Sequence, residues 1–301
     1  MLGHPYAGQR IGFATIHHKD RAAAPPFRRV LGAEIAVAPR VDTDSLGTFS
    51  GDIQRKAPLV ETCLLKAEMA FDTLDADYAM ASEGSYGPIE RVPLMASGVE
   101  LMAFIDRKRS LRIVETLVTH RTNWRLRRFE AGDPDVASAA EAMGFPEYGV
   151  FVICGSDPTR PEKNLRTVAE VVAAVDREAK RSDDGQALMI ADMRAHRNPM
   201  RMKVLRALSW KLASRLQCLC PKCRAPGFGH IDSRRGLPCE DCGEPTHYIH
   251  FEVDGCSACG HAVARPRKDS RTAAPRLACT SCRRQSSKRD VSRYSPGRLR
   301  S

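Results

Sequence analysis

The sequence predicts an α/β domain with a mixed sheet and flanking helices, followed by a small cysteine-rich domain and a disordered basic tail. Strand-like apolar runs alternate with helix-like runs over the first two hundred residues. Nine of the eleven cysteines lie between Cys218 and Cys282. Residues 218–301 carry 16 Lys/Arg against 8 Asp/Glu, whereas residues 1–217 carry 31 against 28. We therefore expect three parts, at residues 1–217, 218–282 and 283–301.

Composition indicates a soluble protein. The chain has 301 residues and is 43% hydrophobic, which suits two folded domains. No apolar run approaches the length of a membrane span, and the first ten residues lack the apolar core of a signal peptide. We expect a cytoplasmic protein that does not enter a membrane.

The first strand and the turn after it predict a ligand-binding edge. Residues 11–15 (IGFAT) form a short apolar strand that ends in a polar turn with His17 and Lys19. A helix follows, and Pro25-Pro26 must either delay its start or kink it. Residues 34–38 (EIAVA) form a second strand, typical of a parallel sheet. Such sheets bind ligands at the carboxyl ends of their strands, where His17 and Lys19 lie.

The next stretch has the parts of a nucleotide site. The run ETCLLKAEMAF predicts a helix whose buried stripe is Val60, Leu64, Ala67, Phe71 and Leu74. Glu61 and Lys66 fall off this stripe, so we expect them to face a cleft. A short strand, residues 78–82, leads directly to Glu83. Together with the polar loop DTDSLGTFSGD, these carboxylates could hold a metal ion against phosphates. In the simpler alternative, Glu61 is only an acidic residue near the helix N-terminus, where the helix dipole favours negative charge, and Lys66 is a solvated surface residue.

The middle of the chain predicts further strands of the same sheet. Residues 99–105 and 111–118 form a hairpin, which makes the sheet mixed. The segment 119–132 is polar and basic, with Asn123, Trp124 and Arg125 at its centre. Residues 148–154 form another apolar strand. A helix with a capping box at its start follows, and we expect residues 187–191 to return to the sheet.

The last helix of the first domain has a clear start. Asn198 is a natural N-cap, with proline at the first helical position, and the helix buries Leu205, Leu208, Leu212 and Leu216. His196 and Arg197 precede this helix N-terminus, where anions are favoured. In the simpler alternative, Arg194, Arg197 and Arg201 are only surface charge.

Several segments resemble an uncharacterised bacterial family catalogued as domain of unknown function 6671. These segments are ATIHHK, VDTDSLGTFSGDIQR, ETCLLKAEMA, ASEGSYGP, DMRAHRNPMRMKV, CPKCRAPGFG and RGLPCEDCGEPT. The order of AT-x-x-x-K, a Glu-Thr-headed helix with a Lys, an acidic strand end and a late His-Arg is also similar to inosine/xanthosine triphosphate pyrophosphatases. That resemblance implies their fold and a magnesium-dependent hydrolysis of nucleoside triphosphates.

The pyrophosphatase resemblance implies five substrate-binding residues. Thr15 and Lys19 would contact phosphates, with His17 at a position where those enzymes commonly have Asn. His196 and Arg197 would face the purine base. The first loop is also one residue shorter before its Lys than in those enzymes.

The same resemblance implies three catalytic residues. Glu61 would help to hold magnesium, and Lys66 would offset phosphate charge. Glu83 would be the second metal ligand or the base that activates water. Many of those enzymes have two carboxylates at the strand end where this chain has one.

The cysteines predict two structural zinc ions. They form four Cys-x-x-Cys pairs: Cys220/Cys223, Cys239/Cys242, Cys256/Cys259 and Cys279/Cys282. Each pair presents two thiolates to one tetrahedral ion, and the spacings are those of zinc ribbons. Sequential pairing, the first two pairs on one ion and the last two on the other, is the preferred arrangement; interleaved pairing stays open. Four histidines are alternative ligands, but we expect them to be bystanders: His230, His247, His250 and His261.

The basic C-terminal region suggests a second class of function. Residues 283–301 are rich in Arg and Ser with few apolar side chains, which predicts a disordered tail. Such a tail attracts the phosphate backbone of RNA or DNA. Two hypotheses follow: a metal-dependent nucleotide phosphohydrolase with zinc ribbons, or a zinc-dependent nucleic-acid-binding protein without catalysis.

Overall fold

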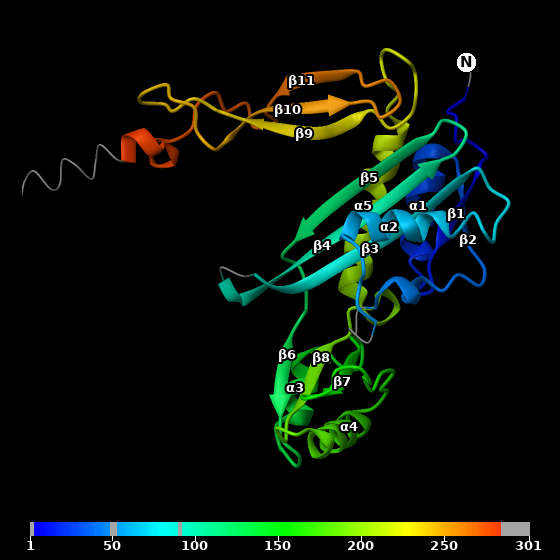
Figure 1. Ribbon diagram of the computed structural model, residues 1–301, viewed down its shortest axis with the longest axis vertical. Coiled ribbons are helices and arrows are strands. Elements are labelled where there is room, and N and C mark those ends of the chain that lie inside the picture. The colour runs from blue at the N-terminus through cyan, green and yellow to red at the C-terminus, as the bar shows by residue number, and fades with distance from the viewer. Residues whose placement is uncertain (1–2, 49–52, 90–91, 284–301) are drawn as a thin grey trace, which may run out of the picture. The chain divides into compact units, whose positions relative to one another are not determined.

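The computed structural model describes residues 3–48, 53–89 and 92–283 (Figure 1). The chain divides into two compact units, residues 1–217 (unit 1) and 218–301 (unit 2). The tail expected from residue 283 onward lies outside the described residues, apart from Arg283 itself. Within the described ranges, every helix is too short or too polar to cross a membrane.

Unit 1 is built on a five-stranded mixed sheet. The strand order is β2 (Glu34–Val37), β1 (Arg10–Ala14), β3 (Tyr78–Ile89), β4 (Val92–Asp106) and β5 (Leu111–Thr119). Strands β2, β1 and β3 are parallel, while β3, β4 and β5 pair antiparallel. The predicted mixed sheet and its β4–β5 hairpin are therefore confirmed.

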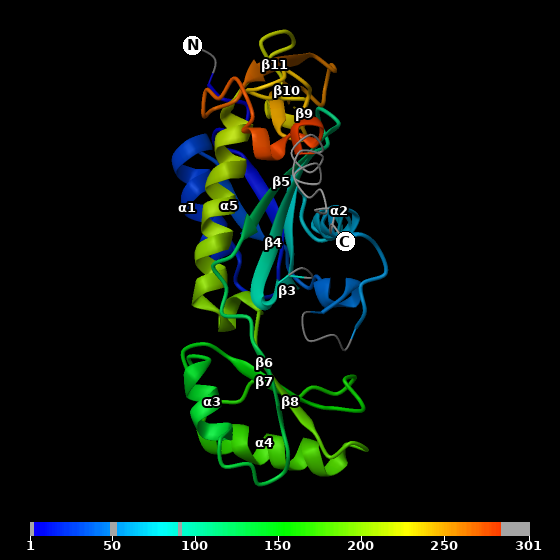
Figure 2. The same cartoon turned by 90° about the vertical axis from the view of Figure 1, so that its left-hand side faces the viewer.

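Helices cover both faces of this sheet. Helices α1 (Asp20–Leu31) and α5 (Pro199–Gln217) lie on one face, and α2 (Leu59–Glu68) lies on the other (Figure 2). The leucine stripe predicted for α5 is fully buried in the core with α1. The Asn198 side chain accepts a hydrogen bond from the Arg201 backbone N–H at 2.9 Å, which confirms the N-cap.

The stripe predicted for α2 is wrong at its first residue, while Leu64, Ala67, Phe71 and Leu74 do pack on the core. Val60 is 46% exposed, and the buried face of the helix consists of Thr62, Cys63, Lys66 and Ala67. The regular α-helix ends at Glu68, so the apolar spacing that ran on to residue 74 crossed a helix end. Periodicity of apolar residues did not reveal that Lys66 shares the buried face.

Strand β3 is longer than predicted. It continues to Ile89, so Glu83 lies inside the strand rather than at its end. However, β1 pairs with β3 only up to Ala14 beside Ala81, and beyond that point β3 pairs with β4 alone. Glu83 therefore lies just past the carboxyl end of β1, where parallel α/β sheets present their ligand sites.

A second, smaller sheet also belongs to unit 1. Strands β6 (Leu126–Phe129), β8 (Ala187–Ala191) and β7 (Val150–Cys154) form an antiparallel sheet in that order. Its buried face packs with α3 (Val136–Ala142) and α4 (Val168–Arg181). The prediction that residues 187–191 (β8) return to the main sheet is wrong, because apolar runs identify strands but not their partners.

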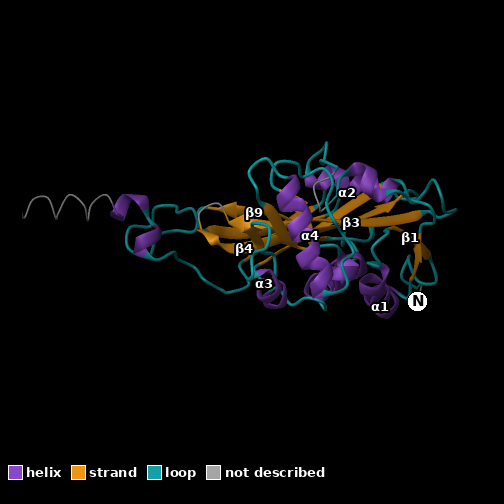
Figure 3. Ribbon diagram, turned by 90° about the horizontal axis from the view of Figure 1, so that it is seen from below, coloured by secondary structure: helices purple, strands orange, loops and turns teal. Residues whose placement is uncertain are grey.

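Unit 2 contains a three-stranded antiparallel sheet. Its order is β11 (Ala262–Pro266), β10 (Ile249–Gly255) and β9 (Gly229–Arg235). Helices α1 to α5 all belong to unit 1, whereas the described part of unit 2 has short helical turns, such as Arg276–Ala278; Figure 3 draws all helices purple. Apart from its cysteines, the described part of unit 2 buries few apolar side chains, chiefly Leu237, Val253 and Ala274.

Candidate phosphate site and cysteine clusters

Three cations converge on Glu83 in unit 1. Its Oε2 accepts a hydrogen bond from Lys66 Nζ at 2.6 Å, and its Oε1 accepts one from Arg55 at 2.8 Å. Burial alone would raise the pKa of Glu83, but the charges of Lys19 and Lys66 and these hydrogen bonds lower it below its ordinary value. Glu83 is thus held as a carboxylate with more positive than negative charge around it.

Lys19 is buried to about the same degree as Lys66. Its Nζ donates to the Ser82 carbonyl at 2.9 Å, and the residue is 7% exposed. Burial and the nearby charge of Arg201 lower the pKa of Lys19 to about 8, against the attraction of Glu83 and Glu100. The hydroxyl of Ser82 is buried and has no hydrogen-bond partner in the described part of the chain. An excess of buried positive charge around Glu83 suits an anionic ligand.

Two histidines lie beside this cluster. The rings of His17 and His196 stack with centroids 4.9 Å apart, and His17 Nε2 lies 3.7 Å from an Asp44 oxygen. Burial lowers the pKa of both histidines; that of His196 falls to about 4, with further repulsion from His17 and Arg194. Both imidazole rings are therefore largely uncharged at pH 7.

The structure brings together most of the residues predicted for catalysis and for substrate binding. Lys19, Lys66 and Glu83 lie in one cluster, and His17 and His196 stack beside it. Thr15 is buried at the end of β1, and its hydroxyl accepts a hydrogen bond from the His17 backbone.

Two predicted residues lie outside the cluster. Glu61 is exposed on α2, and among the described residues its side chain has no hydrogen bond or ion pair. Arg197 donates to the Leu165 carbonyl at 2.9 Å, within the part of unit 1 that carries the second sheet. The suggested roles of Glu61 and Arg197 stay predictions.

A second buried carboxylate lies on the opposite face of the same strands. Glu100 of β4 is fully buried and pairs with Arg201 Nε at 2.5 Å, while Tyr86 donates to it at 2.9 Å. Arg201 also donates to the Met193 carbonyl. The simpler alternative, in which Arg201 is only surface charge, is wrong for this residue.

Two members of this region, Arg55 and Glu100, were not predicted from the sequence. The burial of Arg201 as the partner of Glu100 was not predicted either. Arg55 follows the polar loop that was singled out, but a lone arginine in a polar stretch gives no signal of its target. Glu100 interrupts the apolar run of β4, and a charged residue inside such a run does indicate a buried ion pair.

The residues around Glu83 do not fit a preformed magnesium site. Magnesium prefers carboxylate oxygens that are free of competing cations. Both oxygens of Glu83 are already bound by Lys66 and Arg55, and Glu61 is exposed. In the described residues, the groups of three or more metal-ligating side chains consist of cysteines alone.

Eight cysteines of unit 2 form two groups of four that could hold two zinc ions. One group is Cys220, Cys223, Cys256 and Cys259; the other is Cys239, Cys242, Cys279 and Cys282. Within each group the potential ligand atoms lie within 4.8 Å of one another. The closest sulfur atoms are 3.4 to 3.8 Å apart, too far for a disulfide and suitable for a tetrahedral ion.

The preferred sequential pairing of the cysteines is wrong, because the pairs interleave. Strands β9 and β10 are antiparallel, so Gly229 at the start of β9 faces Gly255 at the end of β10. The first Cys-x-x-Cys turn precedes β9 and the third follows β10, so the register places them together. The second and fourth turns are likewise connected by the bridge from Cys239 to Ala274.

The positive charge of folded unit 2 is largely neutralised internally. Arg265 pairs with Asp254, Arg267 with Asp269, and Arg276 with Asp241. The described residues 218–283 carry 10 Lys/Arg against 7 Asp/Glu, so much of the excess charge of this region lies in residues 284–301. The folded part of unit 2 therefore offers little net charge for nucleic acid.

Comparison with known families identifies the class of protein. A family model described as a domain of unknown function (DUF6671) matches residues 66–283. The match covers well over half of the chain, so this protein belongs to that family. It includes Lys66, Glu83 and all eight paired cysteines, and it begins after Thr15, His17 and Lys19. No curated protein matches the chain.

Proposed function

We propose that unit 1 binds the phosphate chain of a nucleotide at the cluster around Glu83 and hydrolyses a phosphoanhydride bond. The observation that supports this most is the convergence of Lys19, Lys66 and Arg55 on one carboxylate just past the end of β1. Three cations against one anion leave a positive site that a phosphate would neutralise. The neutral rings of His17 and His196 lie beside it, where a flat base could stack.

The chemistry needs few groups from the protein. Phosphoryl transfer depends mainly on charge neutralisation and on an aligned water, with little covalent participation by the enzyme. Lys19, Lys66 and Arg55 would neutralise the phosphate oxygens, and Glu83 would orient the water that attacks phosphorus. The water oxygen forms the new P–O bond and gives up a proton to the Glu83 carboxylate, while the anhydride P–O bond breaks and its electron pair stays on the leaving phosphate oxygen. Magnesium would arrive as part of the nucleotide substrate, because the described residues offer no preformed site for it.

Turnover of a panel of nucleoside triphosphates by the full chain, with magnesium, tests this proposal. Release of phosphate and of pyrophosphate should be followed separately. We expect Arg55→Ala to weaken nucleotide binding about tenfold or more, because a hydrogen bond to a charged group contributes about 1.5–3 kcal/mol. Glu83→Gln should bind nucleotide but lose turnover.

Arg29→Ala is the matched control for Arg55→Ala. Arg29 is exposed on α1 and has no ion pair within the described residues. It should leave binding and turnover unchanged. If the intact protein neither binds nor cleaves any nucleotide of the panel, the proposal is rejected.

For unit 2, we propose two structural zinc ions bound by the two cysteine groups. Four thiolates close a tetrahedral site and leave no position for a substrate. Because unit 2 buries few apolar side chains, metal binding would supply much of its folding free energy. Elemental analysis of the purified chain should give two zinc ions per molecule.

A further inference from the structure

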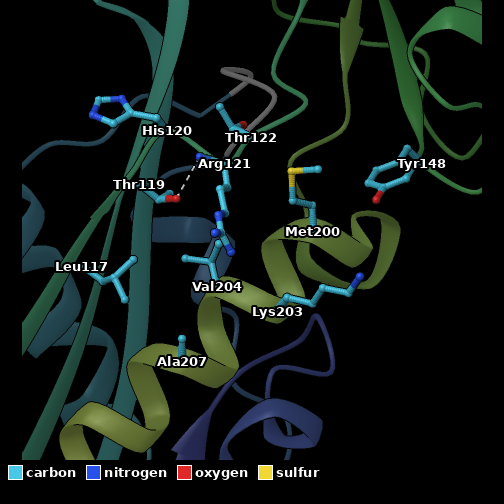
Figure 4. Close-up of a pocket in the computed structure, with 10 residues that line it drawn as sticks. All are labelled: Leu117, Thr119, His120, Arg121, Thr122, Tyr148, Met200, Lys203, Val204 and Ala207. Carbon is cyan, nitrogen blue, oxygen red and sulfur yellow. Dashed lines mark hydrogen bonds between the residues drawn. The ribbon is translucent and has the colours of Figure 1, made fainter.

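A hollow of about 580 Å³ lies in unit 1, away from the cluster around Glu83. Its apolar side comes from β5 and the first turns of α5: Leu117, Met200, Val204 and Ala207. Tyr148 adds an aromatic ring, and Arg121 and Lys203 are exposed at it. Figure 4 shows the Arg121 side chain extending toward Val204. This volume and lining are typical of a site for a small, partly apolar group.

A second hollow of about 470 Å³ adjoins the first. The two share His120 and Thr122 in their walls. In Figure 4 the His120 ring points away from the first hollow. The second hollow is lined by Trp124, Arg125 and Arg127 among others, which belong to the basic segment noted in the sequence. Both hollows thus lie along one stretch of chain.

All charged residues that line these two hollows are basic. Their linings include Arg121, Arg125, Arg127 and Lys203, and no Asp or Glu. Neither residues 119–128 nor the whole of α5 contains an acidic residue. The side chains of Arg121 and Lys203 have no hydrogen bond or ion pair among the described residues. In contrast to Arg265, Arg267 and Arg276 of unit 2, Arg121 and Lys203 have no carboxylate partner in the part of the chain that the structure describes.

We propose that this surface binds single-stranded nucleic acid. Two adjoining hollows with apolar or aromatic walls suit successive unstacked bases, and the exposed cations beside them suit the phosphates. A mononucleotide would fill one hollow and leave the other cations unused. A duplex keeps its base faces stacked inside, so it would not enter the hollows.

Trp124 provides a local readout in the full chain. The protein has two tryptophans, so Trp210→Phe leaves Trp124 as the single emitter. A fluorescein-labelled 20-mer, rU20 or dT20, reports total binding by anisotropy. An unlabelled 20-mer reports binding at this surface by quenching Trp124 emission. Binding at the basic tail alone would change anisotropy without quenching.

The variant Arg121→Ala/Lys203→Ala tests the cations. Both residues are exposed, so the fold should persist, which circular dichroism can check. We expect about tenfold weaker binding of the single strand, as measured by quenching. The slope of the logarithm of the binding constant against the logarithm of the salt concentration should be smaller by about 1.4, because each phosphate contact contributes about 0.7 for single strands. Lys180→Ala, an exposed lysine on α4, is the control and should change neither value.

The expected result is saturable quenching by either 20-mer, with much weaker quenching by a 20-base-pair duplex and by UMP. The proposal is overturned if anisotropy shows binding while Trp124 emission is unchanged. It is also overturned if UMP or the duplex quenches at the same concentration as the single strand, or if the double variant binds like the parent. None of these results depends on nucleotide hydrolysis at Glu83.

Discussion

Different interactions stabilise the interior of unit 1 and the interior of unit 2. Unit 1 buries extended apolar clusters between its sheets and helices, and its buried ion pairs lie within them. Unit 2 has a small apolar cluster around Leu237 and Ala274, and two groups of four cysteines. In unit 1 the polar clusters are additions to an apolar core, whereas in unit 2 the cysteine groups replace such a core.

This difference separates two roles for buried polar groups. Around Glu100 the charges balance one to one, and the carboxylate is saturated by Arg201 and Tyr86. Around Glu83 the cations outnumber the carboxylate, and the Arg55 side chain reaches solvent. A balanced, enclosed pair stabilises a fold, while an unbalanced cluster at the sheet edge is suited to a ligand.

The largest expected effect is in unit 2. Replacing the first and third cysteine pairs with serine removes one complete group if the pairing is interleaved, and damages both groups if it is sequential. We therefore expect the variant Cys220→Ser/Cys223→Ser/Cys256→Ser/Cys259→Ser to retain one zinc ion, measured by elemental analysis after gel filtration. A variant that retains no zinc would contradict the interleaved arrangement.

Cys218→Ser is the control for this experiment. Cys218 is exposed and belongs to neither group, so two zinc ions should remain. Removing all metal with a strong chelator should unfold unit 2 and leave the cooperative thermal transition of unit 1, because the unit 1 cores need no metal. Limited proteolysis would then cleave after residue 217 and spare residues 3–217.

In unit 1 the largest effect of a single substitution is expected at Arg201. Arg201→Met leaves Glu100 buried without a counter-charge, which should lower the free energy of unfolding by about 3–5 kcal/mol. Glu100→Leu/Arg201→Met removes both charges and should recover most of this loss. Chemical denaturation measures both values. Equal losses in the single and double variants would show that the ion pair is not the cause.

Much of the fold of unit 1 could be predicted from sequence, where local pattern decides structure. The stripe of α5 and the cap at Asn198 follow from spacing and from a single hydrogen bond. The buried face of α2 could not be predicted, since Lys66 is buried only because Glu83 faces it from another element. The separate second sheet and the cysteine pairing depend on which strands pair, which spacing along the chain does not determine.

The candidate site was predicted in part for the same reason. Lys19 and His17 follow a strand, and strand ends are where ligands bind, so position along the chain was informative. Arg55 reaches Glu83 from a loop 28 residues earlier, and such a contact exists only in three dimensions. Glu61 lies outside the cluster because the side of α2 that carries Lys66 faces the core, and this orientation of the helix likewise depends on contacts in three dimensions.

The smallest expected effect is a pH dependence at Lys19 in unit 1, where burial and the charge of Arg201 lower the pKa of the lysine. The pKa of Lys19 is about 8 in the folded protein, below its ordinary value of 10.5. Between these values the unfolded chain binds more protons at this residue, so its contribution to stability rises with pH. A bound phosphate would favour the protonated form. Nucleotide affinity should therefore fall above pH 8, by at most about tenfold per pH unit.

Lys19→Arg distinguishes this cause from other titrations nearby. Arginine stays charged throughout this range, so the fall in affinity above pH 8 should disappear if Lys19 is its source. The groups that surround Lys19 are Glu83, Glu100, Lys66 and Arg201. Calorimetric titration at pH 7, 8 and 9 in buffers of different ionisation enthalpy would also count the protons taken up. An unchanged pH dependence in Lys19→Arg would remove Lys19 from the phosphate site, since its charge would then not be coupled to the ligand.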